Sequence, residues 1–291
     1  MNTPQPGILA PALEHGRFIE FSMLPGRDPG PVLEALATME LGEQFVMGLG
    51  PALIQGLGHS PAPLPSSLRS FPNMAGPGCA VLSTQRDIWC WVRGDDRGRN
   101  VHGARAVARA LAPAFQAVSV VDGFTHRGGR DLSGYVDGTE NPVAEAAVAA
   151  AIAEDGSSFV AVQQWRHDLD QFDRLEQSVR DDIIGRRLSD NVEFEGAPPS
   201  AHVKRTAQES FAPEAFILRR SLPWADATGE GLMFVAFGHS LDAFEVQLRR
   251  MCGLDDGITD GLFRFTQPLT GSYFWCPPTV GGCLDLRTIG I

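Results

Sequence analysis

Apolar and polar positions along this 291-residue chain repeat one order of elements twice. Strands are predicted where apolar residues alternate with polar ones or form short β-branched runs, and helices where apolar residues recur every three or four positions. The first half gives strand, helix, strand, strand, helix and strand over residues 17–23, 31–44, 79–83, 88–92, 103–115 and 117–121.

The second half repeats this order, with strand, helix, strand, strand, helix and strand over residues 159–165, 169–184, 215–222, 232–237, 241–252 and 272–275. A β-α-β-β-α-β order written twice predicts an α+β fold, a tandem ferredoxin-like duplication with two antiparallel sheets covered by helices. The division between the halves is predicted at residue 145, which gives domains over 1–145 and 146–291.

One long segment of the second half, residues 185–213, has no regular pattern. It is polar and contains Pro198, Pro199 and His202. Irregular segments of this length in a compact domain are often functional. This segment is therefore expected to contribute to a site.

Composition and charge narrow the function classes. The net charge is -11 and the pI about 5.1, so nucleic acid is not expected as a partner, because phosphate binding needs clustered Lys and Arg. The sequence contains no apolar run of membrane-spanning length and no secretion signal near its start. Five cysteines without a CxxC pair fit free thiols in a reducing compartment. We expect a soluble, cytoplasmic protein without a membrane partner.

The segment GYVDGTENP, residues 134–142, places Asp137 beside a glycine, with a second glycine three positions earlier. Glycines at this spacing allow positive φ and let the backbone approach a flat object closely. Asp137 would then face that object. The simpler interpretation is a surface turn with a solvated aspartate, the usual setting of an Asp-Gly pair.

His202 and the pair Arg219–Arg220 are further candidates. Imidazole is the commonest protein ligand of haem iron, although a histidine in a polar loop is usually a solvated surface residue. The two arginines follow an apolar run, and strand alternation cannot turn both to solvent. One of them must face the interior, where an unpaired charge is costly, and Asp137 is a candidate partner.

These residues together resemble the dye-decolourising haem peroxidases. Asp137 in GYVDGTENP, His202 in SAHVKRT and Arg219 in ILRRSLP resemble the family's distal aspartate, proximal histidine and distal arginine. The resemblance extends along most of the chain, through QPGIL at 5–9, IGR at 184–186 and RFTQPLTG at 264–271. Arg219 is preferred over Arg220 because it follows the Ile-Leu pair as in the family pattern.

The resemblance implies a haem-dependent peroxidase with one haem b, iron protoporphyrin IX, in the C-terminal half. It would reduce hydrogen peroxide and oxidise phenolic or dye-type aromatic donors. Asp137 would be the distal acid–base residue, Arg219 the distal charge stabiliser and His202 the axial iron ligand. The family also forms symmetric assemblies, so a homo-oligomer is expected.

Several roles stay open at this stage. The hydrogen-bond acceptor for the iron-free nitrogen of His202 is sought among Asp255, Asp256 and Asp260. Ser221, which shares a strand face with Arg219, is expected to join the distal polar group. Arg205 and Asn141 are candidate contacts at the haem edge, with a surface salt link and a turn cap as their simpler interpretations.

Two other functions compete with peroxidation. One is haem handling, in which the chain binds haem or a porphyrin, stores it, delivers it or releases its iron, and peroxidase activity is incidental. The other is a ferredoxin-like interaction module without catalysis. Trp89 and Trp91 share one strand face, which is explained more simply by core packing than by electron transfer.

Overall fold

The computed structural model describes residues 2–57 and 64–291. Within these residues, no helix is long and apolar enough to cross a membrane. The N-terminal half contains α1 (Pro6–Leu9), β1 (His15–Met23), α2 (Gly30–Leu36), β2 (Phe45–Leu49), α3 (Pro51–Gly56), β3 (Met74–Gly76), β4 (Cys79–Val81), β5 (Ile88–Gly94), α4 (Arg97–Leu111) and β6 (Phe115–Phe124).

Two predictions for this half were wrong. The helix expected over 31–44 ends at Leu36, and the segment after it forms the missed strand β2. Four of the five residues of β2 are buried, so the strand lacks the alternation that reveals a half-buried strand. The strand expected over 79–83 is present as β4, but it pairs with β3 in a separate hairpin and not with the strand expected over 88–92.

Helix α5 (Ala144–Ala151) leads into the C-terminal half. This half contains β7 (Ser158–His167), α6 (Leu169–Asp173), α7 (Gln177–Ile184), α8 (His202–Arg205), η1 (Gln208–Ser210), β8 (Leu218–Arg219), β9 (Leu222–Asp226), β10 (Gly229–Gly238), α9 (Asp242–Met251), η2 (Gly261–Arg264), β11 (Thr266–Pro268), β12 (Ser272–Cys276), β13 (Thr279–Val280), β14 (Cys283–Leu284) and η3 (Arg287–Ile289).

Two predicted elements of this half are each divided. The helix expected over 169–184 is two helices, because the backbone of Glu176 is extended and interrupts the helical hydrogen bonds. The strand expected over 215–222 is β8 followed by β9. The strands and helix expected over 159–165, 232–237, 241–252 and 272–275 match β7, β10, α9 and β12 within a few residues.

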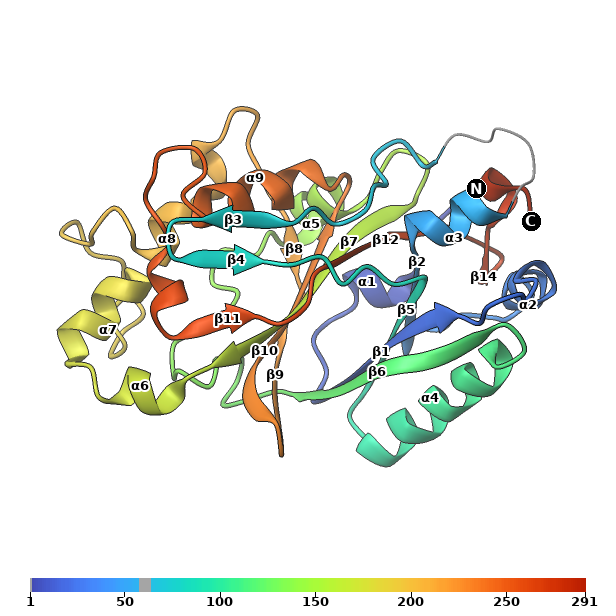
Figure 1. Cartoon of the computed structure of the whole chain (residues 1–291), viewed down its shortest axis with the longest axis horizontal. Coiled ribbons are helices and arrows are strands. Elements are labelled where there is room, and N and C mark those ends of the chain that lie inside the picture. Colours follow the sequence, from blue (N-terminus) through green and yellow to red (C-terminus); the bar gives the residue numbers. More distant parts are fainter. Residues whose placement is uncertain (1, 58–63) are drawn as a thin grey trace.

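The two halves share one antiparallel strand order. The N-terminal order is β2-β5-β1-β6, and the equivalent C-terminal order is β9-β10-β7-β12. In both halves this is the second, third, first and fourth strand of the repeat. Single bridges join the halves, Leu49 with Trp275 and Gly123 with Trp224. The sequence predicted two separate sheets, whereas the structure has one closed ring of eight strands (Figure 1).

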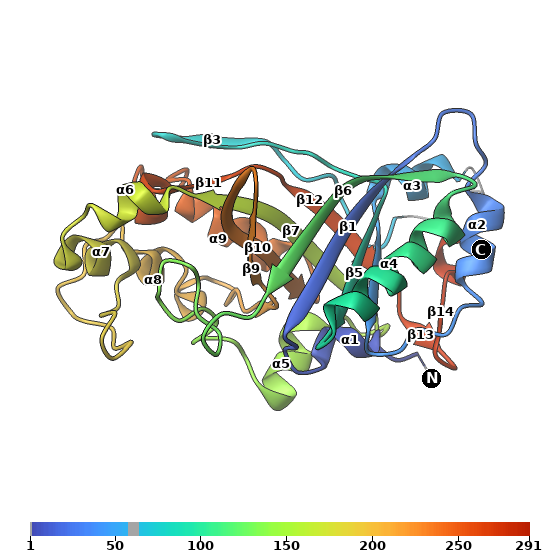
Figure 2. The ribbon, with the colours of Figure 1, turned by 90° about the horizontal axis from the view of Figure 1, so that it is seen from below.

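The ring has an apolar interior and an outer face covered by helices. Trp89, Trp91 and Phe274 lie in the interior cluster, where Trp89 stacks on Phe274 with ring centroids 6.3 Å apart. The core-packing interpretation of the two tryptophans therefore agrees with their burial. Helix α4 covers the outer face of the N-terminal strands, and α9 covers that of the C-terminal strands (Figures 1 and 2).

Candidate active site

A cavity of about 450 Å³ lies between the outer face of the C-terminal strands and the helices that cover it. Alternate strand residues form one wall, because side chains at positions i and i+2 share a face: Gln163, Trp165 and His167 from β7, Ile217 and Arg219 on the β8 segment, and Leu232 and Phe234 from β10. The opposite wall comes from α8, α9 and η2, through His202, Phe244, Gln247, Leu248, Met251 and Leu262. This volume is typical of cofactor sites.

Asp137 and Arg219 enter the cavity from different segments and meet there. The Arg219 Nε atom lies 3.9 Å from Oδ1 of Asp137. The Asp137 backbone N–H donates to the Gly129 carbonyl at 2.9 Å, and Gly138 follows with φ of +77°, a conformation that favours glycine. The loop backbone thus fixes the direction of the carboxylate.

The cavity changes the acidity of Asp137. Although 31% of its side-chain surface stays accessible, burial raises the pKa of the carboxyl above its ordinary value. The Arg219 guanidinium opposes this rise, the Asp131 carboxylate adds to it, and the hydrogen bond from the backbone N–H of Gly138 opposes it. A carboxyl with a raised pKa beside a fixed cation is suited to proton exchange.

Alternation along the strand turns the side chains of Arg219 and Arg220 to opposite faces. Arg219 lines the cavity, whereas the Arg220 guanidinium donates to the carbonyls of Arg219 and Leu9 at 3.3 and 3.4 Å. Within the described residues, Nε of Arg219 is buried without a hydrogen-bond partner. The cavity arginine is therefore the one preferred from the sequence.

Asn141 and Ser221 support the backbone around Arg219 and lie outside the cavity lining. The Asn141 side chain donates to the Arg219 carbonyl at 3.0 Å and accepts from its N–H at 2.8 Å. The Ser221 hydroxyl accepts from the N–H of Val235 at 3.3 Å. Both residues hold the strand that carries Arg219. Their expected contact with a cofactor stays a prediction.

His202 begins the short helix α8 and faces the cavity from the helical wall. Its Nδ1 lies 2.8 Å from Oδ2 of Asp260, whose side chain is fully buried. The other oxygen, Oδ1 of Asp260, accepts from the N–H of Leu262 at 2.8 Å. With Nδ1 held in this way, Nε2 of His202 remains for a ligand.

The other two aspartates are paired elsewhere, so the structure selects Asp260 among the three candidates. Asp256 accepts two hydrogen bonds from Arg205, at 2.7 and 2.8 Å, and Asp255 pairs with Arg249 at 3.2 Å. Arg205 is buried by this pair and lies outside the cavity lining. The salt link considered for Arg205 is thus present, and it joins the buried Arg205 to the exposed Asp256.

The sequence interpretation missed His167 and Asp131 in the cavity wall. The ring of His167 lies between two partners, with Nε2 3.1 Å from Oδ2 of Asp131 and Nδ1 2.6 Å from the Thr266 hydroxyl. Burial raises the pKa of the Asp131 carboxyl, but its contacts with His167 and Ser133 outweigh burial and hold that pKa below its ordinary value. The alternation of Gln163, Trp165 and His167 along one strand was the available signal.

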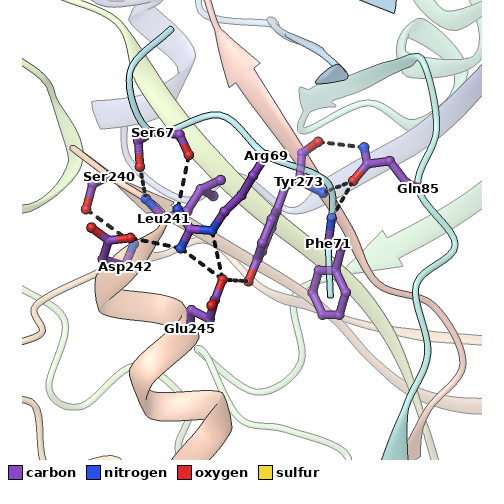
Figure 3. Close-up of polar contacts among 9 residues, drawn as sticks. All are labelled: Ser67, Arg69, Phe71, Gln85, Ser240, Leu241, Asp242, Glu245 and Tyr273. Atoms are coloured by element: carbon purple, nitrogen blue, oxygen red, sulfur yellow. Dashed lines mark hydrogen bonds and ion pairs between the residues drawn. The ribbon is translucent and has the colours of Figure 1, made fainter. Parts of the chain in front are cut away.

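Helix α9 is fixed against the N-terminal half by Arg69. The Arg69 guanidinium donates to Asp242 at 2.8 Å and to Glu245 at 3.0 Å. Glu245 also accepts from the Tyr273 hydroxyl at 3.4 Å (Figure 3). Phe244, between the two acidic residues on α9, lines the cavity, so this network positions the helical wall.

Residues 9–125 match the family description "Dyp-type peroxidase, N-terminal", and residues 128–281 match "Dyp-type peroxidase, C-terminal". The chain belongs to the Dyp-type peroxidase family. Membership confirms the resemblance drawn from the sequence and the haem peroxidase class that it implied. The division predicted at residue 145 stays a prediction.

Similar proteins agree with this assignment. A dye-decolorizing peroxidase of Rhodococcus erythropolis is 29% identical, over 94% of this chain and 86% of the relative. One from Mycolicibacterium paratuberculosis is also 29% identical, over 74% of this chain, but the match spans 64% of the relative's length.

Solved structures confirm the α+β fold. A dye-decolorizing protein from Vibrio cholerae superposes with a TM-score of 0.81 and 28% identity, covering 94% of this chain and 96% of that chain. A Rhodococcus jostii DypB variant in complex with heme gives a TM-score of 0.85 and 25% identity, covering 95% and 96%.

The residues of the cavity fit the haem that the sequence predicts. His202 offers one free ring nitrogen, while the helical wall offers the apolar side chains of Leu248, Met251 and Leu262. Among the described residues, two buried donors of the lining, Arg219 Nε and Gln163 Nε2, lack a hydrogen-bond partner. Buried donors without partners are rare in folded proteins and indicate a missing ligand or water.

Proposed function

We propose that this chain is a haem-dependent peroxidase, with one haem b in the C-terminal cavity, that reduces hydrogen peroxide and oxidises phenolic or dye-type aromatic donors. The observation that carries this proposal is that two polar pairs lie on different walls of the same cavity. The His202–Asp260 pair lies on the helical wall, and the Asp137–Arg219 pair lies across the cavity. The heme complex of the R. jostii relative supports the choice of cofactor.

His202 is the proposed axial ligand, through Nε2. The buried Asp260 carboxylate accepts a hydrogen bond from Nδ1, which fixes the ring orientation and increases the electron donation of the imidazole. When bound, the haem supplies the redox chemistry that passes electrons from the donor to peroxide. The apolar side chains of α9 exclude water from the rest of this wall.

Asp137 and Arg219 are proposed to act on peroxide itself. The ionised Asp137 carboxylate takes the proton from the attacking peroxide oxygen and returns it to the oxygen that leaves as water. The Arg219 guanidinium stabilises the negative charge that develops as the O–O bond breaks. Because Asn141 and the strand hold the backbone of Arg219, this charge is positioned before the reaction starts.

The decisive experiment compares haem-loaded protein with and without hydrogen peroxide, in the presence of a phenolic dye. We expect a visible Soret band, one haem per chain by pyridine haemochrome assay, and dye oxidation that stops when peroxide is removed. Protein that binds haem and leaves both peroxide and dye unchanged would instead support haem handling. Protein that takes up no haem would refute both functions.

A further inference from the structure

Two of the five free cysteines meet at the contact between the halves of the molecule. Cys79 lies on β4, partly exposed, and its thiol donates to the backbone carbonyl of the buried Cys252 with an S–O distance of 3.8 Å. Cys252 directly follows helix α9, whose last residue, Met251, lines the cavity. The cysteines are 173 positions apart in the sequence, so the fold alone brings them together.

The β3–β4 hairpin is built to approach Cys252 closely. A Cβ atom at Gly76 would lie 1.7 Å from the Cys252 carbonyl oxygen and 3.4 Å from its Cβ atom, so only glycine allows this contact. Gly76 is also the strand partner of Cys79. Both cysteines therefore extend from backbone segments in direct contact.

A second contact holds the hairpin turn in place. The Thr259 hydroxyl donates to the carbonyl of Pro77 at 2.6 Å, and Thr259 forms a β-bridge with Cys252. Figures 1 and 2 show the hairpin extending from the N-terminal half over the C-terminal half. The two thiols are thus held at a docked interface.

We propose that Cys79 and Cys252 form a dithiol pair that hydrogen peroxide oxidises to a disulfide. The proposal takes its oxidant from the proposed function and requires no other co-reactant. It assigns the hairpin contact as a modification site, separate from the cavity.

The oxidation has two steps. The Cys79 thiolate attacks one peroxide oxygen, so that an S–O bond forms, the O–O bond breaks and the leaving hydroxide takes a proton to become water. The Cys252 sulfur, deprotonated as it reacts, then attacks the Cys79 sulfur, so that the S–S bond forms and a second water leaves. The two thiols lose two electrons, and one peroxide becomes two waters.

The order of attack follows from exposure. Thiolate character and access determine which cysteine meets an oxidant first, and Cys79 is the accessible one. Burial and the neighbouring Cys79 thiol raise the pKa of Cys252 to about 12. Cys252 is therefore the resolving thiol, which reacts with the oxidised sulfur beside it.

The new bond would lie next to the proximal side of the site. The Asp260 backbone N–H donates to the carbonyl of Met251 at 2.8 Å, and the Asp260 carboxylate accepts from His202. A disulfide at Cys252 would fasten the hairpin to this same turn. Peroxide would in this way change the cross-linking beside the residue that positions the axial ligand.

Peptide mapping tests the proposal on haem-loaded protein. The protein is treated with hydrogen peroxide in the absence of a donor, blocked with N-ethylmaleimide and digested with trypsin without reduction. The expected product joins the peptides 70–86 and 251–264, with the mass of a disulfide, and separates with dithiothreitol. Two of the five thiols should be lost.

Two variants make the result specific. Cys79→Ser should abolish the linked peptide and leave Cys252 unmodified. Cys283→Ser, which removes another partly exposed cysteine, should leave the linked peptide unchanged. Five intact thiols, over-oxidised Cys79 without a link, or a link through Cys283 would each overturn the proposal. Since the readout is peptide mass, a failure here leaves the haem and peroxide assays of the proposed function unaffected.

Discussion

The two halves of the molecule share a strand order and differ in what covers their strands. In the N-terminal half, outer-face residues of the first strand, Ile19 and Phe21, are 2% and 1% exposed and pack into a solid core. In the C-terminal half, the first strand places Gln163 and His167 on the outer face, and these line a cavity. The same topology thus gives a core in one half and a site in the other.

The length of one connection explains the difference. Residues 24–44 connect β1 to β2 through the single helix α2, whereas residues 168–217 connect β7 to β8 through α6, α7 and α8. The longer connection brings His202 opposite the strands as part of a second wall. A duplicated fold can therefore gain a site by lengthening one connection and by exchanging apolar outer-face residues for polar ones.

The largest effect is expected from removing the ligand that the long connection provides. His202→Ala should abolish normal haem ligation, because Nε2 of this ring is the proposed iron donor, and the Soret band should weaken and shift. The pyridine haemochrome assay measures the haem retained. His239→Ala is the control, since His239 contacts the Ala150 carbonyl away from the cavity. Full retention of normally ligated haem in the His202 variant would exclude this histidine as the ligand.

Arg219→Leu should have the next largest effect. Loss of one fixed donor to a developing charge typically costs about 2.7–4 kcal/mol, a fall of about 10²–10³ in rate. Stopped-flow measurement of the reaction with peroxide would show this fall. Arg220→Leu is the matched control, because Arg220 is adjacent in sequence and donates to backbone carbonyls instead. If the two variants slow equally, the effect comes from the strand and not from the cavity charge.

The sequence predicted the duplicated order because periodicity is strong where one face of a strand or helix is buried. It failed at β2, which is buried on both faces, and at residues 169–184, where one apolar period continues through a break at Glu176. Closure of the ring depends on single bridges between the halves. Local periodicity carries no information about such contacts.

For the candidate site, too, the local sequence pattern could not predict contacts between distant parts of the chain. Motifs predicted Asp137, His202 and Arg219, which the fold brings to one cavity. They could not choose among three aspartates near His202, since Asp255, Asp256 and Asp260 differ only in the partners that tertiary packing gives them. The pair of His167 and Asp131 was missed for the same reason, because its two members are 36 positions apart.

Asp137→Asn should slow the reaction with peroxide by about 10²-fold, the lower end for loss of a general base, because water can partly substitute. The wild-type rate should fall at low pH as Asp137 becomes protonated. Since burial raises the pKa of this carboxyl, the fall should begin above the ordinary value of about 3.9. The fall should be absent from the variant, and an unchanged acid limb would exclude Asp137 as the proton acceptor.

Stability gives an independent check on the same carboxyl. A raised folded-state pKa means that the folded protein binds the proton more tightly than the unfolded chain does, so stability is lost as pH rises through that pKa. At neutral pH the asparagine variant avoids this loss. Its melting temperature should therefore equal or exceed that of the wild type, and a large decrease would show that Asp137 has a structural role instead.

The smallest effect should come from the half that has no such cavity in its described core. Ile19→Val removes one buried methylene from the outer face of β1 and should lower the free energy of unfolding by about 0.5–1.5 kcal/mol, measured by urea denaturation. The rate with peroxide should stay unchanged, because this face packs on apolar neighbours.

Gln163→Leu on β7 is the counterpart of Ile19→Val in the other half. It should alter the Soret band or the peroxide rate without a comparable loss of stability, because the Nε2 atom of Gln163 is a buried donor without a protein partner in the described residues. If Ile19→Val slows the reaction, or if Gln163→Leu changes only stability, the division between a structural half and a functional half is wrong.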